Sequence, residues 1–175
     1  MEFKKIQLNG FKSFAEKTNF LIEDGLTGIV GPNGCGKSNI VESLRWVMGE
    51  TSAKSMRGSG MEDVIFSGTS NKASKNIAEV SIEVENKDKE GPIQYRELEQ
   101  IQVRRKIEKD KGSKFYINDK EVRARDAQMF FADLSTGAHS PSMISQGRIG
   151  ALVTAKPTDR RAILEEAAGI SGLHV

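Results

Sequence analysis

The sequence predicts an α/β fold, and three observations support that prediction. An apolar run, Leu26–Val30, leads into a glycine-rich loop, and apolar residues then recur at helical spacing from Ser38 to Met48. Apolar and polar side chains alternate at Ile77–Val84 and again between residues 98 and 118, which is typical of strands. Helical spacing returns at Arg125–Leu134. Strands and helices are therefore expected within one chain.

The first half of the chain supplies the connections between these elements. Residues 2–30 predict strands and turns, with alternation at Lys4–Leu8 and a turn signal at Asn9-Gly10. Gly49 stands where a helix stop is expected. From Thr51 to Lys75 the composition shifts to Ser, Gly, Lys and Met, and this segment predicts mostly loop around a short apolar island at residues 64–66.

The second half predicts a hairpin, a helix and a loop before a last helix. Asn118-Asp119 forms a tight turn into the segment KEVRA, and a Gly/Ser-rich loop is expected at Ser135–Gly150. Pro157 introduces the last helix, with Thr158 as its expected N-cap and a stop near Gly169.

Composition excludes several classes of protein. The chain has 175 residues, enough for a hydrophobic core, and 29% charged residues, as in a globular domain with a solvated surface. Its single cysteine, Cys35, excludes an internal disulfide framework. Neither a signal peptide nor the roughly 18 consecutive apolar residues of a membrane span is present, so we expect a cytoplasmic protein. The net charge of +2 leaves a polyanionic partner open.

The glycine-rich loop, Gly31–Ser38, has the sequence GPNGCGKS and fits the pattern G-x-x-x-x-G-K-[ST] in full. Glycines let the backbone curl so that successive N–H groups point at phosphate oxygens, and the following helix adds its positive dipole end. Lys37 would reach the β- and γ-phosphates, and the Ser38 hydroxyl would ligate Mg²⁺. A chance Lys-Ser pair after a glycine-rich turn is the alternative, but the strand before the loop and the helix after it favour nucleotide binding.

Five segments, in the same order, resemble those of one family. They are LNGFKSFA, GPNGCGKSNIVESLRWVMGE, SMRGSGMEDVIFSG, ISQGRI and KPTDRRAILEEAAGIS. They span nearly the whole chain, which resembles the N-terminal head segment of the structural maintenance of chromosomes (SMC) proteins, of the bacterial type. The resemblance implies a P-loop NTPase head of the ATP-binding-cassette (ABC) type, with a mixed β-sheet, flanking helices, and ATP and Mg²⁺ as cofactors.

The resemblance also implies roles for particular residues. Gln146 in ISQGRI matches the Q-loop glutamine, which contacts Mg²⁺ and helps place the attacking water. Arg57 in SMRGSG matches an arginine that approaches the γ-phosphate, so Lys37, Gln146 and Arg57 are the catalytic candidates. Lys12 and Ser13 match positions close to the phosphates, and Asp63 lies where relatives approach the adenine. The expected nucleotide-binding set is Lys12, Ser13, Pro32, Asn33, Gly34, Cys35, Gly36, Lys37, Ser38, Asn39, Asp63 and Gln146, and the expected metal ligands are Ser38 and Gln146.

Two motifs that hydrolysis requires in this superfamily are missing from the sequence, namely an apolar strand ending in Asp-Glu and a signature loop of the LSGGE type. Met129–Asp133 imitates the first, but Leu134 follows it and its spacing is helical, so Asp133 is interpreted as an exposed helix carboxylate. In SMC proteins both motifs lie at the far C-terminal end, beyond a long coiled coil. We therefore expect half of a head, with residues 1–170 forming its N-terminal lobe and residues 171–175 beginning a coiled-coil arm.

Basic residues gather between Arg96 and Arg125, where ten Lys and Arg accompany six Asp and Glu. The stretch KDKGSK is expected at a hairpin tip, where cations could contact a DNA backbone without reading its sequence. Composition alone favours a solvated surface, whereas the resemblance implies contact with duplex DNA by a pair of full heads. It further implies a homodimer of full-length chains with kleisin-type accessory subunits. Such a nucleoid-associated ATPase would drive DNA entrapment, chromosome condensation and segregation.

Three other interpretations stay open at this point. Coiled-coil recombination and repair ATPases share the loop, although SMRGSGMEDVIF and EEAAGIS look less like them. A transporter ATPase predicts a shorter gap than the 109 positions that separate Lys37 from Gln146. A small-molecule kinase would need an acceptor site and a lid, and the sequence offers no clear one.

Overall fold

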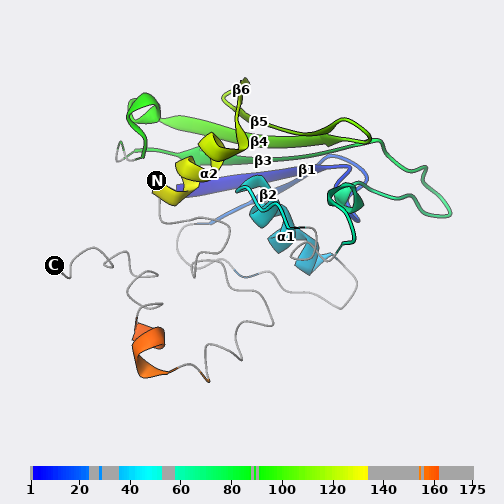
Figure 1. Cartoon of the computed structure of the whole chain (residues 1–175), viewed down its shortest axis with the longest axis horizontal. Helices are drawn as coiled ribbons and strands as arrows, with labels where there is room; N and C mark the ends of the chain where they lie inside the picture. The colour runs from blue at the N-terminus through cyan, green and yellow to red at the C-terminus, as the bar shows by residue number, and fades with distance from the viewer. Residues whose placement is uncertain are drawn as a thin grey trace.

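The computed structural model describes residues 2–23, 28, 36–52, 58–87, 89, 91–133, 154 and 156–161. Its main element is a six-stranded sheet with the strand order β2-β1-β3-β4-β5-β6 (Figure 1). All five strand pairings in this described part are antiparallel. The strands are β1 (Glu2–Asn9), β2 (Thr18–Leu21), β3 (Ile77–Glu85), β4 (Gln100–Glu108), β5 (Gly112–Ile117) and β6 (Lys120–Val122).

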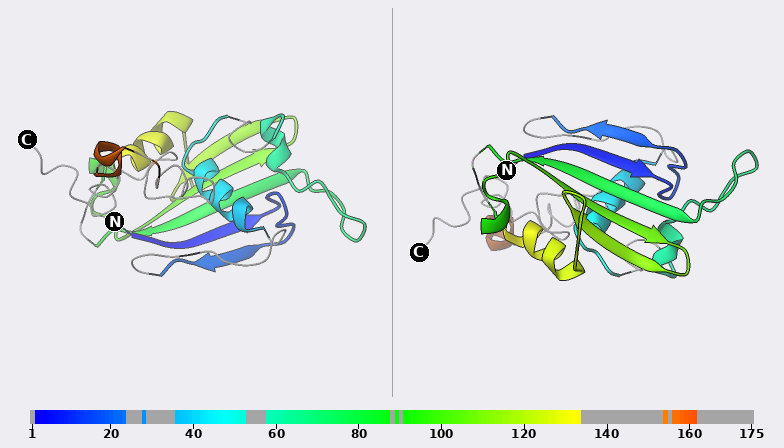
Figure 2. Two further views of the ribbon diagram at one scale, coloured as in Figure 1. Left: turned by 90° about the horizontal axis from the view of Figure 1, so that it is seen from below. Right: turned by 90° about the horizontal axis from the view of Figure 1, so that it is seen from above.

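Two α-helices, α1 (Lys37–Val47) and α2 (Ala124–Asp133), lie on the same face of this sheet. Figure 2 shows α1 in front of the strands in one view and behind them in the opposite view, with α2 beside the strands. The alternation of the strand sequences explains this one-sided arrangement, because successive side chains of a strand point to opposite faces. In β4, for example, Ile101, Val103 and Ile107 are buried while the residues between them are partly exposed, apart from Arg105, which is buried with them.

The hydrophobic core lies between the sheet and the helices. Cross-strand pairs such as Ile6 with Ile82 and Ile82 with Val103 line its floor. Trp46 of α1, which is fully buried, and Phe130 of α2 close it from above. Burial of such apolar faces is the main favourable term that holds the helices on the sheet.

The sequence predicted most of these elements within one or two residues. The helix expected at Ser38–Met48 begins at Lys37 and ends at Val47, and Gly49 follows it with a φ of 105°, as expected of a helix stop. The strand expected at Leu26–Val30 lies outside the described residues except for Gly28. The expected exposure of Asp133 is likewise undescribed, although Asp133 does end α2.

Two expectations were wrong in detail. The hairpin tip is shorter than KDKGSK, because β5 already begins at Gly112 and only residues 109–111 form the turn. Residues 157–161 are helical, and the Lys156 carbonyl accepts hydrogen bonds from the N–H groups of Asp159 and Arg160. Thr158 therefore lies inside this helical turn and is not its N-cap, because Pro157 already has the fixed φ that suits a first helical position.

The segment expected to be mostly loop, residues 51–75, contains a short 3₁₀ helix, η1 (Met61–Val64). A second, η2 (Ile93–Tyr95), precedes β4. Residues after η1 attach to the turn between β1 and β2, here called the FKSF turn (residues 10–14): Phe11 bridges Ile65, and the Phe66 N–H donates to the Gly10 carbonyl at 2.8 Å. A side chain at position 10 is excluded, because its Cβ would lie 2.3 Å from the Ile77 carbonyl oxygen. The FKSF turn is therefore joined to the segment that follows η1.

None of the helices in the part of the chain that the structure describes is long and apolar enough to cross a membrane.

Candidate nucleotide site

The N-terminal end of α1 is built to receive an anion. Gly36, the last glycine of the loop, precedes the helix in the left-handed conformation (φ 89°, ψ 9°), and its carbonyl accepts the first helical bond, from Ile40. No side chain caps this end in the described structure, and its first turn carries no acidic residue. Lys37 and Ser38 are the first two helical residues, and Ser38 is exposed. Helix N-termini of this kind favour negatively charged groups such as phosphates.

The FKSF turn closes on this end of the helix. A Cβ atom at position 36 would lie 3.1 Å from the Ser13 hydroxyl oxygen and 3.2 Å from the ring of Phe14. Glycine is therefore favoured at position 36 both by the positive φ and by the close approach of this turn. The start of α1 thus lies beside Ser13, one of the residues that the resemblance implies near the phosphates.

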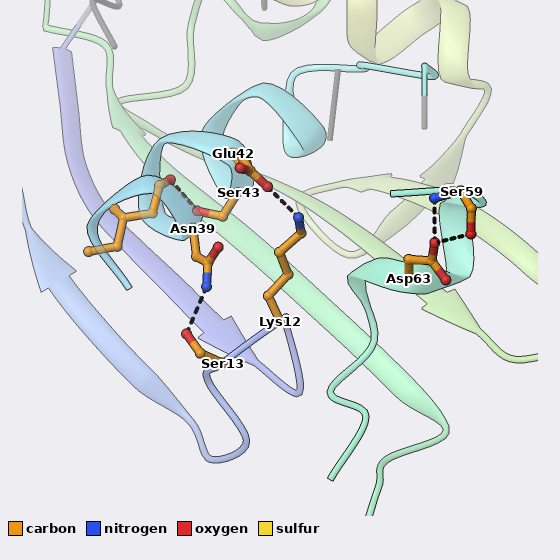
Figure 3. Close-up of polar contacts among 8 residues, drawn as sticks. Lys12, Ser13, Asn39, Glu42, Ser43, Ser59 and Asp63 are labelled. Atoms are coloured by element: carbon orange, nitrogen blue, oxygen red, sulfur yellow. Dashed lines mark hydrogen bonds and ion pairs between the residues drawn. The ribbon is translucent and has the colours of Figure 1, made fainter. Parts of the chain in front are cut away.

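Two side-chain contacts tie the FKSF turn to α1 (Figure 3). The Asn39 amide donates to the Ser13 hydroxyl at 2.9 Å. The Lys12 ammonium lies 2.5 Å from a carboxylate oxygen of Glu42, and these two side chains are only 13% and 7% exposed. Lys12 adopts a positive φ of 47°, and its own N–H donates to the Val64 carbonyl at 2.6 Å. The turn is thereby joined to the helix on one side and to the end of η1 on the other.

Glu42 is the residue of this cluster that the sequence analysis missed. It lies five positions after Lys37 on α1 and directly follows Ile40 and Val41, which are part of the apolar pattern. Its exposure is 5%, so this charged side chain is buried. A carboxylate buried on a helix needs a partner, and Lys12 supplies a cation. The available signal was a glutamate within the helical stretch that reaches the core, but the sequence did not indicate which lysine would meet it.

Asp63 holds the loop that follows Arg57. One of its carboxylate oxygens accepts hydrogen bonds from the Ser59 N–H (2.6 Å) and the Ser59 hydroxyl (2.8 Å) (Figure 3). The Gly60 N–H donates to the same oxygen at 3.0 Å. These bonds, that of Gly60 first, lower the pKa of Asp63 below its usual value, and the positive charge of Lys12 adds a smaller effect. Gly58 passes so close that a Cβ there would lie 3.0 Å from that of Asp63. The contacts described for Asp63 are therefore within its own loop.

The structure brings together one part of the predicted site. Gly36, Lys37, Ser38 and Asn39 lie at the start of α1, Lys12 and Ser13 lie in the turn against it, and Asp63 is connected to them through η1. The predicted residues Pro32, Asn33, Gly34, Cys35, Arg57 and Gln146 lie outside the described residues.

The basic segment between Arg96 and Arg125 is less available than its composition suggests. Arg105 is buried at 3% exposure. Four more cations form ion pairs, which are Arg104 with Glu79 and Asp119, Lys111 with Glu108, Lys114 with Glu121, and Arg123 with Asp126. At the hairpin tip the Asp110 N–H donates to Glu62 of η1 at 2.8 Å. Arg96 also donates to the Gly91 carbonyl at 3.2 Å, so at least six of the ten cations are engaged within the protein.

Comparison with known proteins agrees with this geometry. The family model described as RecF/RecN/SMC N terminal domain matches residues 2–148. The chain is 55% identical to the chromosome partition protein Smc of Cereibacter sphaeroides over 174 residues and 52% identical to that of Rhodopseudomonas palustris. These alignments cover 99% of the chain but only 15% of each relative, so the chain spans about 15% of the length of these curated relatives.

Solved structures give the same result for the fold. One, from a study of ATP-driven dimerization and DNA-stimulated activation of SMC ATPases, has a TM-score of 0.80 and 30% identity, covering 94% of this chain and 98% of that one. Another, an Smc head bound to the C-winged-helix domain of ScpA, has a TM-score of 0.82 and 31% identity, covering 97% of this chain and 52% of that one. The predicted P-loop head fold and the resemblance to SMC heads are confirmed.

Proposed function

Because the chain belongs to the RecF/RecN/SMC N-terminal domain family, we propose that it forms the nucleotide-binding half of an SMC-type ATPase head. The observation that supports this most directly is the glycine-started helix α1, which presents Lys37 and Ser38 at its positive end beneath the FKSF turn. The curated relatives described above are Smc proteins, which favours this function over that of a recombination or repair ATPase.

The expected ligand is ATP with Mg²⁺. In this proposal the loop residues 32–36 surround the phosphates with backbone N–H groups, and Lys37 contacts the β- and γ-phosphates. Ser38 and Gln146 hold the metal ion, which would neutralise charge on the phosphate oxygens. Arg57 approaches the γ-phosphate, and Asn39 and Ser13 support the phosphate end. Lys12 lies next to the phosphates and remains paired with Glu42. Asp63 holds the loop that follows Arg57, and this fixes the path of the chain by which Arg57 approaches the nucleotide.

The chain is half of a catalytic unit in this proposal. Residues 1–170 are the N-terminal lobe of the head, and residues 171–175 begin a coiled-coil arm. The missing Asp-Glu strand and signature loop come from another part of a longer protein and from a second head. Two heads would then close around ATP and reopen after hydrolysis.

Partners are assigned on the same basis. One relative in the comparison is described as dimerizing with ATP and being stimulated by DNA, and another is bound to ScpA. We infer a homodimer of full-length chains, a kleisin-type accessory subunit, and contact with duplex DNA through its phosphate backbone, which is independent of sequence. The protein would act on the nucleoid in the cytoplasm, in chromosome condensation and segregation.

Replacing Lys37 with alanine tests the proposal. In the full-length protein, Lys37→Ala should weaken ATP binding by about 100-fold, since a charge-assisted contact to phosphate is lost. The unfolding temperature should stay unchanged, because Lys37 lies at the open end of α1. Isothermal titration calorimetry with ATP and Mg²⁺ measures the affinity, and Lys75→Ala, in an exposed loop, is the control. Equal ATP affinity of Lys37→Ala and the unmodified protein would refute the nucleotide site.

A further inference from the structure

The C-terminal end of α1 is held by side chains from distant parts of the chain. Backbone carbonyls at this end of a helix lack intrahelical partners. The Arg105 guanidinium donates from one nitrogen, Nη1, to the carbonyls of Trp46 (2.9 Å) and Glu50 (2.6 Å). The Gln128 amide of α2 donates to the Gly49 carbonyl at 2.9 Å. Arg105 is 59 positions from Trp46 in sequence, so this attachment is a tertiary contact.

Arg105 also connects α1 to two neighbouring strands. It belongs to β4, and its Nε and Nη2 atoms lie 3.3 and 3.1 Å from the Ser113 hydroxyl of β5. Its guanidinium lies between the rings of Trp46 and Phe115, 4.7 and 4.6 Å from their centres. The Arg105 side chain therefore bonds backbone carbonyls at the end of α1, packs against the ring of Trp46, and bonds Ser113 on the neighbouring strand β5.

Burying a charged arginine in this space costs desolvation energy. Burial lowers the pKa of Arg105 to about 10, although the nearby Glu50 opposes this, and the group stays charged at neutral pH. Replacing a buried ion with an apolar residue of similar volume is often neutral or stabilising, so stability alone does not account for an arginine here. What an apolar residue lacks is the fork of donors that fixes the direction and position of the helix backbone. The positive charge also suits the negative end of the helix dipole.

We propose that Arg105 is a positioning residue for the nucleotide site: it holds the far end of α1 so that Lys37 and Ser38 meet the phosphates in the correct place. The inference rests on the proposed function. An α-helix of 11 residues is a stiff rod of about 16 Å, so a tilt at its anchored end displaces the open end. Displacements of about 1 Å at a binding site are sufficient to change affinity or rate strongly.

The test compares nucleotide affinity with stability in the full-length protein. Arg105→Met keeps much of the volume between Trp46 and Phe115 but removes the donors, and Arg105→Lys keeps the charge with a single donor head. Val103→Ala is the matched control, because Val103 is buried two positions earlier on the same face of β4 and its truncation lowers stability by removing core volume. ATP affinity is measured by calorimetric titration, and stability by thermal unfolding of the head.

We expect Arg105→Met to weaken ATP binding about tenfold, with Arg105→Lys between it and the unmodified protein, while Val103→Ala lowers the unfolding temperature and leaves the affinity unchanged. Unchanged affinity in both Arg105 variants, or an equal loss in Val103→Ala at equal destabilisation, overturns the proposal. If Arg105→Met does not fold, the affinity of Arg105→Lys decides. An unmodified protein that binds no ATP refutes the proposed function itself, which is a different result from normal binding that Arg105 does not affect.

Discussion

The two ends of α1 are treated in opposite ways by the rest of the chain. At its N-terminal end a glycine in the left-handed conformation starts the helix without a capping side chain among the described residues, and Lys37 and Ser38 follow it. At its C-terminal end Arg105 and Gln128 bond the carbonyls directly. Both ends carry orphan backbone groups. The difference teaches that the protein closes the end it uses for anchoring and keeps the other end suited to an anion.

A glycine marks each end, but for different reasons. A Cβ at Gly36 would press on Ser13 and Phe14 of the FKSF turn at just over 3 Å. At Gly49 it would lie 2.3 Å from Cγ of Gln128. The first glycine allows a turn to approach the predicted phosphate loop, and the second allows α2 to pack against the end of the helix. Substitutions at the two ends are therefore expected to change ATP affinity and stability in different proportions.

The largest expected loss of stability follows from removing the cation of the buried pair at the open end. Lys12→Met leaves Glu42 buried without this partner, and we expect a loss of about 3–4 kcal/mol in the free energy of unfolding. Chemical denaturation measures it. In the double variant with Glu42→Gln the buried charge is gone, so the loss should be smaller than in Lys12→Met alone. A double variant as unstable as the sum of both single variants would show that the pair is not coupled.

At the anchored end, Gly49→Ala should cost about 2–3 kcal/mol, through its positive φ and its collision with Gln128. Gly112→Ala is the matched control, because Gly112 also has a positive φ (79°) but nothing lies within 4 Å of a Cβ there, so about 1 kcal/mol is expected. Gln128→Ala should relieve part of the Gly49→Ala loss. Equal losses at positions 49 and 112 would contradict the packing account. ATP affinity should fall by less than the tenfold expected of Arg105→Met, because Arg105 still bonds the carbonyls of Trp46 and Glu50 in this variant.

At the open end, Gly36→Ala should lower stability less, by about 1–2 kcal/mol, because the contacts with Ser13 and Phe14 are looser and the turn can shift slightly. Because the turn and the start of α1 are in contact, a change in their spacing also moves Lys37 and Ser38. ATP affinity should therefore fall by about tenfold or more. Calorimetric titration with ATP compares the affinity of Gly36→Ala with that of Gly49→Ala. If Gly49→Ala weakened ATP binding as much as Gly36→Ala, the division between an anchoring end and a binding end would be wrong.

The smallest expected effect concerns the loop beside the open end. The pKa of Asp63 is lowered below 3.8 by bonds from Gly60 and Ser59, so its carboxylate stabilises the folded state fully above pH 3.8. This contribution is lost as the pH falls through the lower folded pKa. The unfolding temperature of Asp63→Asn should therefore lie below that of the unmodified chain at neutral pH, and the difference should shrink as the pH falls through the folded pKa, which lies below 3.8. A difference that persists unchanged at the lowest pH would contradict the role of the charge.

Local pattern predicted the regular elements well, because period and glycine position are properties of short segments. The bounds of α1 and β3 and the stop at Gly49 followed from spacing alone. The partners of buried charged groups did not. Arg105 belongs to a run of three cations, and nothing distinguishes it from its partly exposed neighbours until strand alternation and the position of α1 are known. The pairing of Lys12 with Glu42 depends on a turn packing against a helix 30 positions later, and η1 forms because the FKSF turn and Asp63 hold it.

The long sequence distance between α1 and its anchors has a consequence for synthesis on the ribosome. Arg105 and Gln128 follow the helix by 55 to 79 positions, so α1 leaves the exit tunnel well before either of them. The strands β3 to β6 are neighbours in sequence and can pair as they emerge, whereas seating of α1 requires closure of a long loop. The helix α1, whose start forms part of the predicted phosphate site, is therefore synthesised early but reaches its final packed position late.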